Sequence, residues 1–279
     1  MSYPLGGCGR NSAYSIDGAL RVGGFTPLSL SDWPGQLAAV VFCQGCPWRC
    51  GYCHNPHLIP PRAATSLEWR DVFSFLERRR GLLDAVVFSG GEPLLQAGIG
   101  RALAAVKALG FKLGLHTAGA YPRRLAALLP SLDWIAMDIK APFARYAATT
   151  GVAGSGAPAL ESARLILASG VDYEFRTTVH PDLLPAAQLA ALAGSLAQLG
   201  ARHYALQEFR PQGCASHKLN AACTAPFLNE ATLSGAIAPL FDSFCVRHSD
   251  TNLGTMSSFP SFDSETARAR ARCRSALPR

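Results

Sequence analysis

The sequence predicts an α/β fold, a partial (β/α)6 barrel of the TIM type. Short apolar runs alternate with longer helical patterns about six times along the chain, and right-handed crossovers roll such an alternation toward a barrel. The length of 279 residues suits one unit of this kind. Unusual polar residues fall at the ends of the predicted strands, where such barrels place their chemistry.

The predicted strands are apolar and rich in β-branched residues, as buried parallel strands are. They cover residues 37–43, 84–93, 111–119, 132–142, 171–181 and 202–211. Helical patterns lie at 65–81, 94–110, 121–130, 157–170 and 183–200. We therefore expect a loose N-terminal segment over 1–23, a barrel domain over 24–250 and a basic, disordered tail over 251–279.

The composition indicates a globular protein that does not enter membranes. Hydrophobic residues make up 49% of the chain and charged residues 16%, which excludes broad disorder. No run reaches the ~18 apolar residues of a membrane helix, and the N-terminus lacks the apolar core of a signal peptide. We expect a cytoplasmic location. The net charge is +7, and many of the arginines lie in the C-terminal tail. We expect this tail to be solvated and not to bind nucleic acid specifically.

Four of the nine cysteines fall within eleven residues, in the stretch FCQGCPWRCGYCHNP. In a reducing compartment this spacing favours metal or cluster ligation over disulfides. A zinc site with all four ligands would be unusually compact, and the C-x2-C-x2-C spacing of ferredoxins is absent. A third interpretation takes only Cys46, Cys50 and Cys53 as cluster ligands and leaves one iron open. Cys43 then belongs to the strand as a small buried hydrophobe.

The residues around these cysteines carry a resemblance to a known family. The stretch from Cys46 to Cys53, with an aromatic residue directly before the last cysteine, resembles the signature of the radical S-adenosylmethionine superfamily. The continuation HNP is similar to that of enzymes that activate glycyl-radical proteins. The upstream stretch GFTPLSLSDWPGQLAAVVFCQGC resembles the activating proteins of anaerobic ribonucleoside-triphosphate reductase. The resemblance runs from about Gly24 to Pro211.

The resemblance implies a radical mechanism and its cofactors. Cys46, Cys50 and Cys53 would hold one [4Fe–4S] cluster per chain, and S-adenosylmethionine would chelate the open iron. Reduction would then yield a 5′-deoxyadenosyl radical, with the protein positioning the cofactor and excluding water. No further cysteine stands between Cys53 and Ser89, so we expect no second cluster and an external one-electron donor such as flavodoxin or ferredoxin.

The resemblance also implies contacts to S-adenosylmethionine. The implied contact residues are Tyr52, Ser89, Gly90, Gly91, Glu92, Thr117, Asp138, Lys140 and Arg176. Tyr52 would lie by the adenine, the two glycines would leave carbonyls open to the ammonium, and Lys140 and Arg176 would meet the carboxylate. Asp138 and Thr117 would help to hold a monovalent cation. His116 stands where relatives often have an aspartate, and imidazole is a poor ligand for a hard cation, so the sequence leaves the cation undecided.

The implied function is the installation of a glycyl radical on a partner protein, with anaerobic ribonucleoside-triphosphate reductase as the expected partner. Two alternatives stay open within the superfamily: activation of a pyruvate formate-lyase type enzyme, and radical chemistry on a small molecule. A third, of another class, is a non-catalytic metal-binding module.

Overall fold

The computed structural model describes residues 20–64, 67–222, 235–248 and 257–258. Most of the predicted tail and most of the predicted N-terminal segment lie outside these residues, but Ser257 and Ser258 of the tail are described and form a short strand. Within the described residues, the strands are β1 (Val22–Ser29), β2 (Ala38–Cys43), β3 (Ala85–Gly90), β4 (Lys112–Thr117), β5 (Trp134–Asp138), β6 (Asp172–Val179), β7 (His203–Glu208), β8 (Ser243–Arg247) and β9 (Ser257–Ser258). The helices are α1 (Trp69–Glu77), α2 (Ile99–Ala108), α3 (Pro122–Leu128), α4 (Tyr146–Thr150), α5 (Gly156–Ser169), α6 (Ala186–Gln198), α7 (His217–Ala222) and α8 (Gly235–Ile237).

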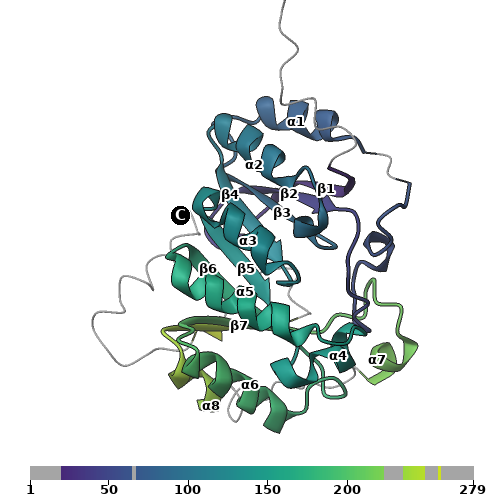
Figure 1. The fold of residues 1–279 in the computed structure, drawn as a ribbon, viewed down its shortest axis with the longest axis vertical. Coiled ribbons are helices and arrows are strands. Elements are labelled where there is room, and N and C mark those ends of the chain that lie inside the picture. Colours follow the sequence, from purple (N-terminus) through teal and green to yellow (C-terminus); the bar gives the residue numbers. More distant parts are fainter. Residues whose placement is uncertain (1–19, 65–66, 223–234, 249–256, 259–279) are drawn as a thin grey trace, which may run out of the picture.

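The strands form a single sheet in the order β1 to β9. Neighbours from β2 to β8 pair in parallel, while β1 and β9 add antiparallel strands at the two edges. Figure 1 shows helices α2, α3, α5 and α6 lying against one face of this sheet. The six predicted strands and five predicted helices are confirmed. The sequence prediction missed β8, which adds one more parallel strand.

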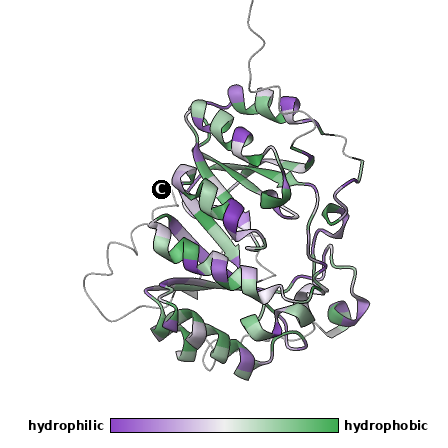
Figure 2. Ribbon diagram, viewed as in Figure 1, coloured by the Kyte–Doolittle hydropathy of each residue, from purple (hydrophilic) through white to green (hydrophobic). Residues whose placement is uncertain are grey.

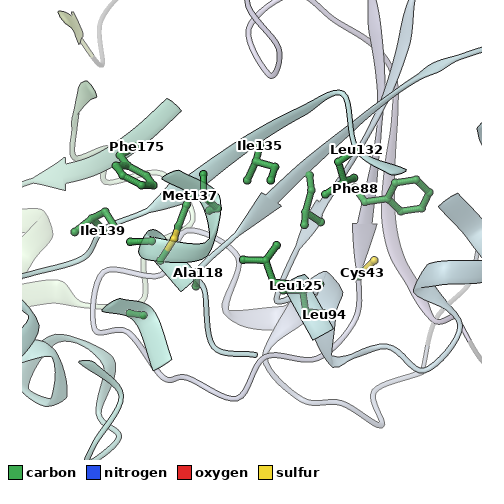
Figure 3. Packing of buried hydrophobic residues seen from close by; sticks show 14 of the residues in the cluster. Cys43, Phe88, Leu94, Ala118, Leu125, Leu132, Ile135, Met137, Ile139 and Phe175 are labelled. Carbon is green, nitrogen blue, oxygen red and sulfur yellow. The ribbon is translucent and has the colours of Figure 1, made fainter. Parts of the chain in front are cut away.

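Alternation along each strand separates two faces of the sheet. The helix-covered face carries the larger apolar cluster, to which β5 contributes Ile135 and Met137 (Figure 3). The opposite face carries a small cluster around Trp33 and Trp134, whose rings stack at 5.3 Å. Figure 2 shows hydrophobic colouring along the central strands, as expected for strands covered on both faces.

Parallel pairing brings the carboxyl ends of β2 to β8 to one end of the sheet. Cys43 pairs with Gly90, Asp138 with Arg176, and Gln207 with Arg247. The loops that follow these strands therefore meet there, as the fold class predicts. Among the described residues, no helix has the length and apolar character of a membrane span.

Candidate functional site

The cysteine loop follows β2 and is fixed by its backbone. The Gly45 N–H donates to the Leu58 carbonyl at 2.7 Å, and the Cys46 N–H donates to the Ile59 carbonyl at 3.0 Å. Farther along, the Arg49 N–H donates to Thr150 at 2.8 Å. The loop thus carries its cysteines on a backbone that is tied both to its own returning segment and to α4.

The four clustered cysteines occupy two different environments. Cys43 is fully buried in the helix-side core near Phe88 and Leu94 (Figure 3), and burial raises the pKa of its thiol. The expectation that Cys43 belongs to the strand is confirmed. Cys46, Cys50 and Cys53 are free thiols on the loop, each partly exposed.

The glycine turn after β3 packs directly against the cysteine loop. Gly90 has a φ of 114°, and a Cβ there would overlap the backbone nitrogen and oxygen of Cys43. A Cβ on Gly91 would overlap the carbonyl oxygen of Gly45. The Gly91 N–H donates to Cys43 and the Glu92 N–H to Gly45, both at 2.9 Å. Close approach to β2 and its loop therefore excludes side chains at both glycines.

Glu92 points into the protein. Its carboxylate is fully buried and accepts hydrogen bonds from the Thr117 hydroxyl and from the N–H groups of Leu94 and Ala118. Burial raises the pKa of Glu92, and these hydrogen bonds oppose the rise. The Glu92 and Thr117 side chains thus bond to each other, which ties the glycine turn to the end of β4.

Lys140 lies beside the cysteine loop, at the end of β5. Its ammonium is 3.3 Å from the Asp138 carboxylate and 5.5 Å from the centre of the Tyr52 ring. Burial alone would lower the pKa of Lys140, but Tyr52, Asp138 and Cys50 hold it well above its usual value. The charged ammonium in turn lowers the pKa of the Cys50 thiol, against the larger opposing effect of burial. The structure therefore brings together four of the predicted residues.

Tyr146 fixes this arrangement from α4. Its hydroxyl accepts a hydrogen bond from the Lys140 N–H at 3.0 Å and donates to the Asp138 carbonyl at 3.4 Å. The ring packs edge-on against Trp48, which lies within the cysteine loop. Tyr146 was not predicted from the sequence, because a tyrosine in an Ala- and Thr-rich segment carries no motif.

Arg176 belongs to a second polar group on the face of the sheet opposite the helices, which we call the inner face. Its Nε donates to Glu174 at 2.8 Å, and Arg247 binds both oxygens of the same carboxylate at 2.8 Å. The Arg176 guanidinium also lies 5.2 Å from the centre of the Trp134 ring. The arginine predicted to meet a carboxylate of the cofactor thus already has a carboxylate partner in the protein.

His116 joins this second group and does not face Thr117. Its Nε2 lies 2.7 Å from the Asp32 carbonyl and its Nδ1 lies 3.3 Å from the Ser89 hydroxyl. Consecutive strand residues point to opposite faces, so the side chains of His116 and Thr117 lie on different sides of the sheet. Within the described part of the chain, no three His, Cys, Asp or Glu side chains are placed to hold a metal ion. Nothing there supports the monovalent cation.

Two further polar residues lie near the carboxyl ends of β6 and β7. His180 is buried, its Nδ1 accepts from the Asp182 N–H at 3.1 Å, and its Nε2 lies 3.2 Å from the Leu219 carbonyl. It therefore connects the loop after β6 to α7. Gln207 lies near the end of β7, beside Arg247.

Comparison with known proteins agrees with this geometry. Residues 40–187, more than half of the chain, match the sequence model of the Radical SAM superfamily. The chain belongs to the radical SAM superfamily. The match runs from β2 through the cysteine loop and into the start of α6.

Several relatives are named as activating enzymes, including one from Methanocaldococcus jannaschii and one from Clostridium pasteurianum. A putative glycyl-radical enzyme activating enzyme of Methanocaldococcus jannaschii is 29% identical over 199 residues, which are 68% of this chain and 80% of the relative. The pyruvate formate-lyase-activating enzyme of Clostridium pasteurianum is 34% identical over 125 residues, 43% of this chain. The matched part spans about half of that second relative, 52%.

Solved structures support the fold. The structure of Streptococcus suis SuiB bound to S-adenosylmethionine superimposes with a TM-score of 0.55 at 14% identity. The match covers 75% of this chain and 49% of SuiB. The partial TIM barrel predicted from the sequence is the fold of this superfamily and of this chain.

Proposed function

We propose that this protein is a radical SAM activating enzyme that installs a glycyl radical on a partner protein. The observation that carries the proposal is the placement of Cys46, Cys50 and Cys53 on one tethered loop, with Lys140 and Tyr52 beside them. The matched activating-enzyme relatives support the same function. When bound, the cluster and S-adenosylmethionine would supply the 5′-deoxyadenosyl radical, and the chain would bind and orient them.

The three loop cysteines fit a [4Fe–4S] cluster. A cluster takes each thiolate on a different iron, so its ligands need not converge on one point as the ligands of a single ion do. Burial raises the pKa of the Cys46 thiol to about 12, so ligation must displace its proton. The ammonium of Lys140 favours the thiolate forms of Cys46 and Cys50. We propose these three cysteines as ligands of the one cluster, with Cys43 excluded.

Lys140, Asp138 and Tyr52 are the side chains that we propose for direct contact with S-adenosylmethionine. The Lys140 ammonium suits the methionine carboxylate, the half-exposed Asp138 carboxylate suits the ammonium group, and the Tyr52 ring suits the adenine. Ser89 and the backbone of the glycine turn complete the contact set. We assign positioning roles to Glu92, Thr117 and Arg176, because their polar atoms are bonded within the protein.

The proposal also names a partner protein and an electron donor. We propose anaerobic ribonucleoside-triphosphate reductase as the partner, on the resemblance of the stretch from Gly24 to Pro56. The Clostridium relative makes a pyruvate formate-lyase type enzyme the alternative. An external flavodoxin or ferredoxin would reduce the cluster. The six cysteines in the described part of the chain are all free, in keeping with a reducing, cytoplasmic location.

The test is anaerobic incubation of the reconstituted protein with reductant, S-adenosylmethionine and each candidate partner in turn. Electron paramagnetic resonance should show a glycyl radical on the reductase and little on a pyruvate formate-lyase. A radical on the lyase alone would move the assignment to the alternative. Cleavage of S-adenosylmethionine with no radical on either protein would favour a small-molecule substrate and contradict the activating function.

A further inference from the structure

Three segments around the cysteine loop carry lysines and arginines and no Asp or Glu. Residues 46–64, 142–155 and 209–222 contain no Asp or Glu. All their lysines and arginines are exposed, namely Arg49, Arg62, Arg145, Arg210 and Lys218. We call these five residues the basic collar.

The three segments are joined around the cysteines. The Arg49 N–H donates to Thr150 in the second segment. The Cys214 thiol in the third lies 3.7 Å from the Gly51 carbonyl, and Tyr52 packs in one cluster with Phe209 and Cys214. The collar thus belongs to one surface that includes the cysteine loop.

The positive charges of the collar are not neutralised within the described part of the chain. None of the five side chains forms an ion pair there, whereas Arg70 pairs with Glu68 and Arg202 with Asp242. The two carboxylates that act on the thiols of Cys46 and Cys50 are both engaged. Asp138 is paired with Lys140, and Glu92 is buried and accepts a hydrogen bond from Thr117. Charges within about 10 Å of a partner are felt at 0.1 M salt, so such a surface attracts an acidic protein and orients it.

We propose that the basic collar docks an acidic electron-carrier protein that reduces the cluster. The inference rests on the proposed function, which requires one electron per turnover from outside. In the step, the reduced carrier loses one electron and the cluster gains it. Electron transfer slows steeply with distance, so the carrier must bind close to Cys46, Cys50 and Cys53, and these lie in the collar surface. Hydrogen abstraction requires instead the inner face of the sheet, beside Asp138 and Ser89.

The experiment measures cluster reduction directly, by stopped-flow bleaching of the visible absorbance. The reconstituted full chain is mixed with a reduced flavodoxin, an acidic one-electron donor, or with photoreduced deazariboflavin, a small reductant. In the charge-reversal variant Arg49→Glu/Arg145→Glu/Arg210→Glu, flavodoxin should reduce the cluster about tenfold more slowly at low salt. Raising the salt should slow the wild type toward the variant, and deazariboflavin should reduce both equally.

Two further variants distinguish the loss of carrier docking from poor assembly of the cluster. Arg78→Glu/Arg80→Glu changes exposed charges beyond the end of α1, away from the collar, and should leave both rates unchanged. Arg145→Glu/Lys218→Glu leaves the cysteine loop intact, and should slow the flavodoxin reaction alone even if the triple variant assembles its cluster poorly.

Equal flavodoxin rates in the wild type and the Arg145→Glu/Lys218→Glu variant would overturn the proposal. So would normal cluster reduction with a selective loss of radical transfer, because the collar would then serve the radical-accepting protein. Failure of the proposed function gives a different result: the cluster would be reduced normally, but neither cleavage of S-adenosylmethionine nor a glycyl radical would follow.

Discussion

The Glu92 carboxylate accepts a hydrogen bond from the Thr117 hydroxyl in the interior of the protein. The hydroxyl oxygen lies 2.8 and 3.0 Å from the two carboxylate oxygens. This pair joins the glycine turn after β3 to the end of β4. Through the Glu92 N–H, which donates to Gly45 at 2.9 Å, it also reaches the cysteine loop. The Glu92–Thr117 pair is therefore the interior support of the candidate site.

Glu92→Gln should destabilise the protein in a pH-dependent way. The amide cannot accept all the hydrogen bonds of the carboxylate, so near pH 5 we expect a loss of about 1–2 kcal/mol in the free energy of unfolding. Burial raises the pKa of Glu92 in the folded state above its ordinary value of 4.5. The stability of the wild type therefore falls as the pH rises from 4.5 through the folded-state pKa. Urea unfolding at several pH values should show the gap to the variant narrowing with pH. A widening gap would mean that the pKa of Glu92 is lowered instead.

Gly90→Ala should cost far more stability than the same change at Gly81. Both glycines have positive φ, 114° and 74°. A Cβ on Gly90 overlaps the Cys43 backbone, while nothing lies within 4 Å of one on Gly81. We expect a loss above about 3 kcal/mol at Gly90 and about 1 kcal/mol at Gly81, measured by urea unfolding. Equal losses would show that the β2 backbone yields and that the glycine is not required for packing.

Glu174→Gln should leave two arginines without their shared carboxylate. We expect a loss of about 3 kcal/mol in the free energy of unfolding at pH 7, at the lower end for a buried pair because Arg247 is partly exposed, 21%. Burial raises the pKa of Glu174, but Arg176 and Arg247 together hold it below its usual value. Its stabilisation is therefore present above pH 4.5 and lost as pH falls through the folded-state pKa.

The control for that prediction is Glu68→Gln, in an exposed pair with Arg70, which should change stability little. Thermal unfolding between pH 3 and 7 separates the two variants. If Glu174→Gln unfolds like the wild type at pH 7, the two arginines have found other partners.

Lys140→Met should weaken the binding of S-adenosylmethionine and leave the cluster in place. A hydrogen bond to a charged group contributes about 1.5–3 kcal/mol, so we expect about 10- to 100-fold lower affinity by equilibrium dialysis. The matched control is Lys112→Met. Lys112 lies at an exposed position at the start of β4, where its ammonium donates to the Gln36 side chain. Unchanged affinity in Lys140→Met would contradict the contact with the carboxylate. A loss of iron would assign the lysine to cluster assembly.

The strands that could be predicted from the sequence are those with a continuous apolar run. Strands such as β2 and β3 are continuously apolar because helices and inner side chains cover both faces. The strand β1 contains two glycines and a proline and lies at an edge, where such residues are tolerated. The strand β8 is five residues long. Neither pattern stands out from loop sequence.

The candidate site could be predicted only in its local parts. The spacing of Cys46, Cys50 and Cys53 is contained in one loop, and that of Asp138 and Lys140 in one strand end. The pairing of Glu174 with Arg247 joins residues 73 positions apart, and its existence depends on the register of β6, β7 and β8. The burial of Glu92 likewise depends on how β3 and β4 meet. Motif similarity implied that Glu92 contacts the cofactor, and its hydrogen bonds within the protein are the reason that we propose a positioning role instead.

Cleavage of S-adenosylmethionine by the reconstituted, reduced protein tests the central claim most directly. We predict equal amounts of methionine and 5′-deoxyadenosine, with about four irons per chain. Products and visible absorbance should be lost in Cys46→Ala, Cys50→Ala and Cys53→Ala, and retained in Cys43→Ala, whose thiol lies in the core. An intact cluster that yields no 5′-deoxyadenosine, or a single zinc in place of the irons, would contradict the account.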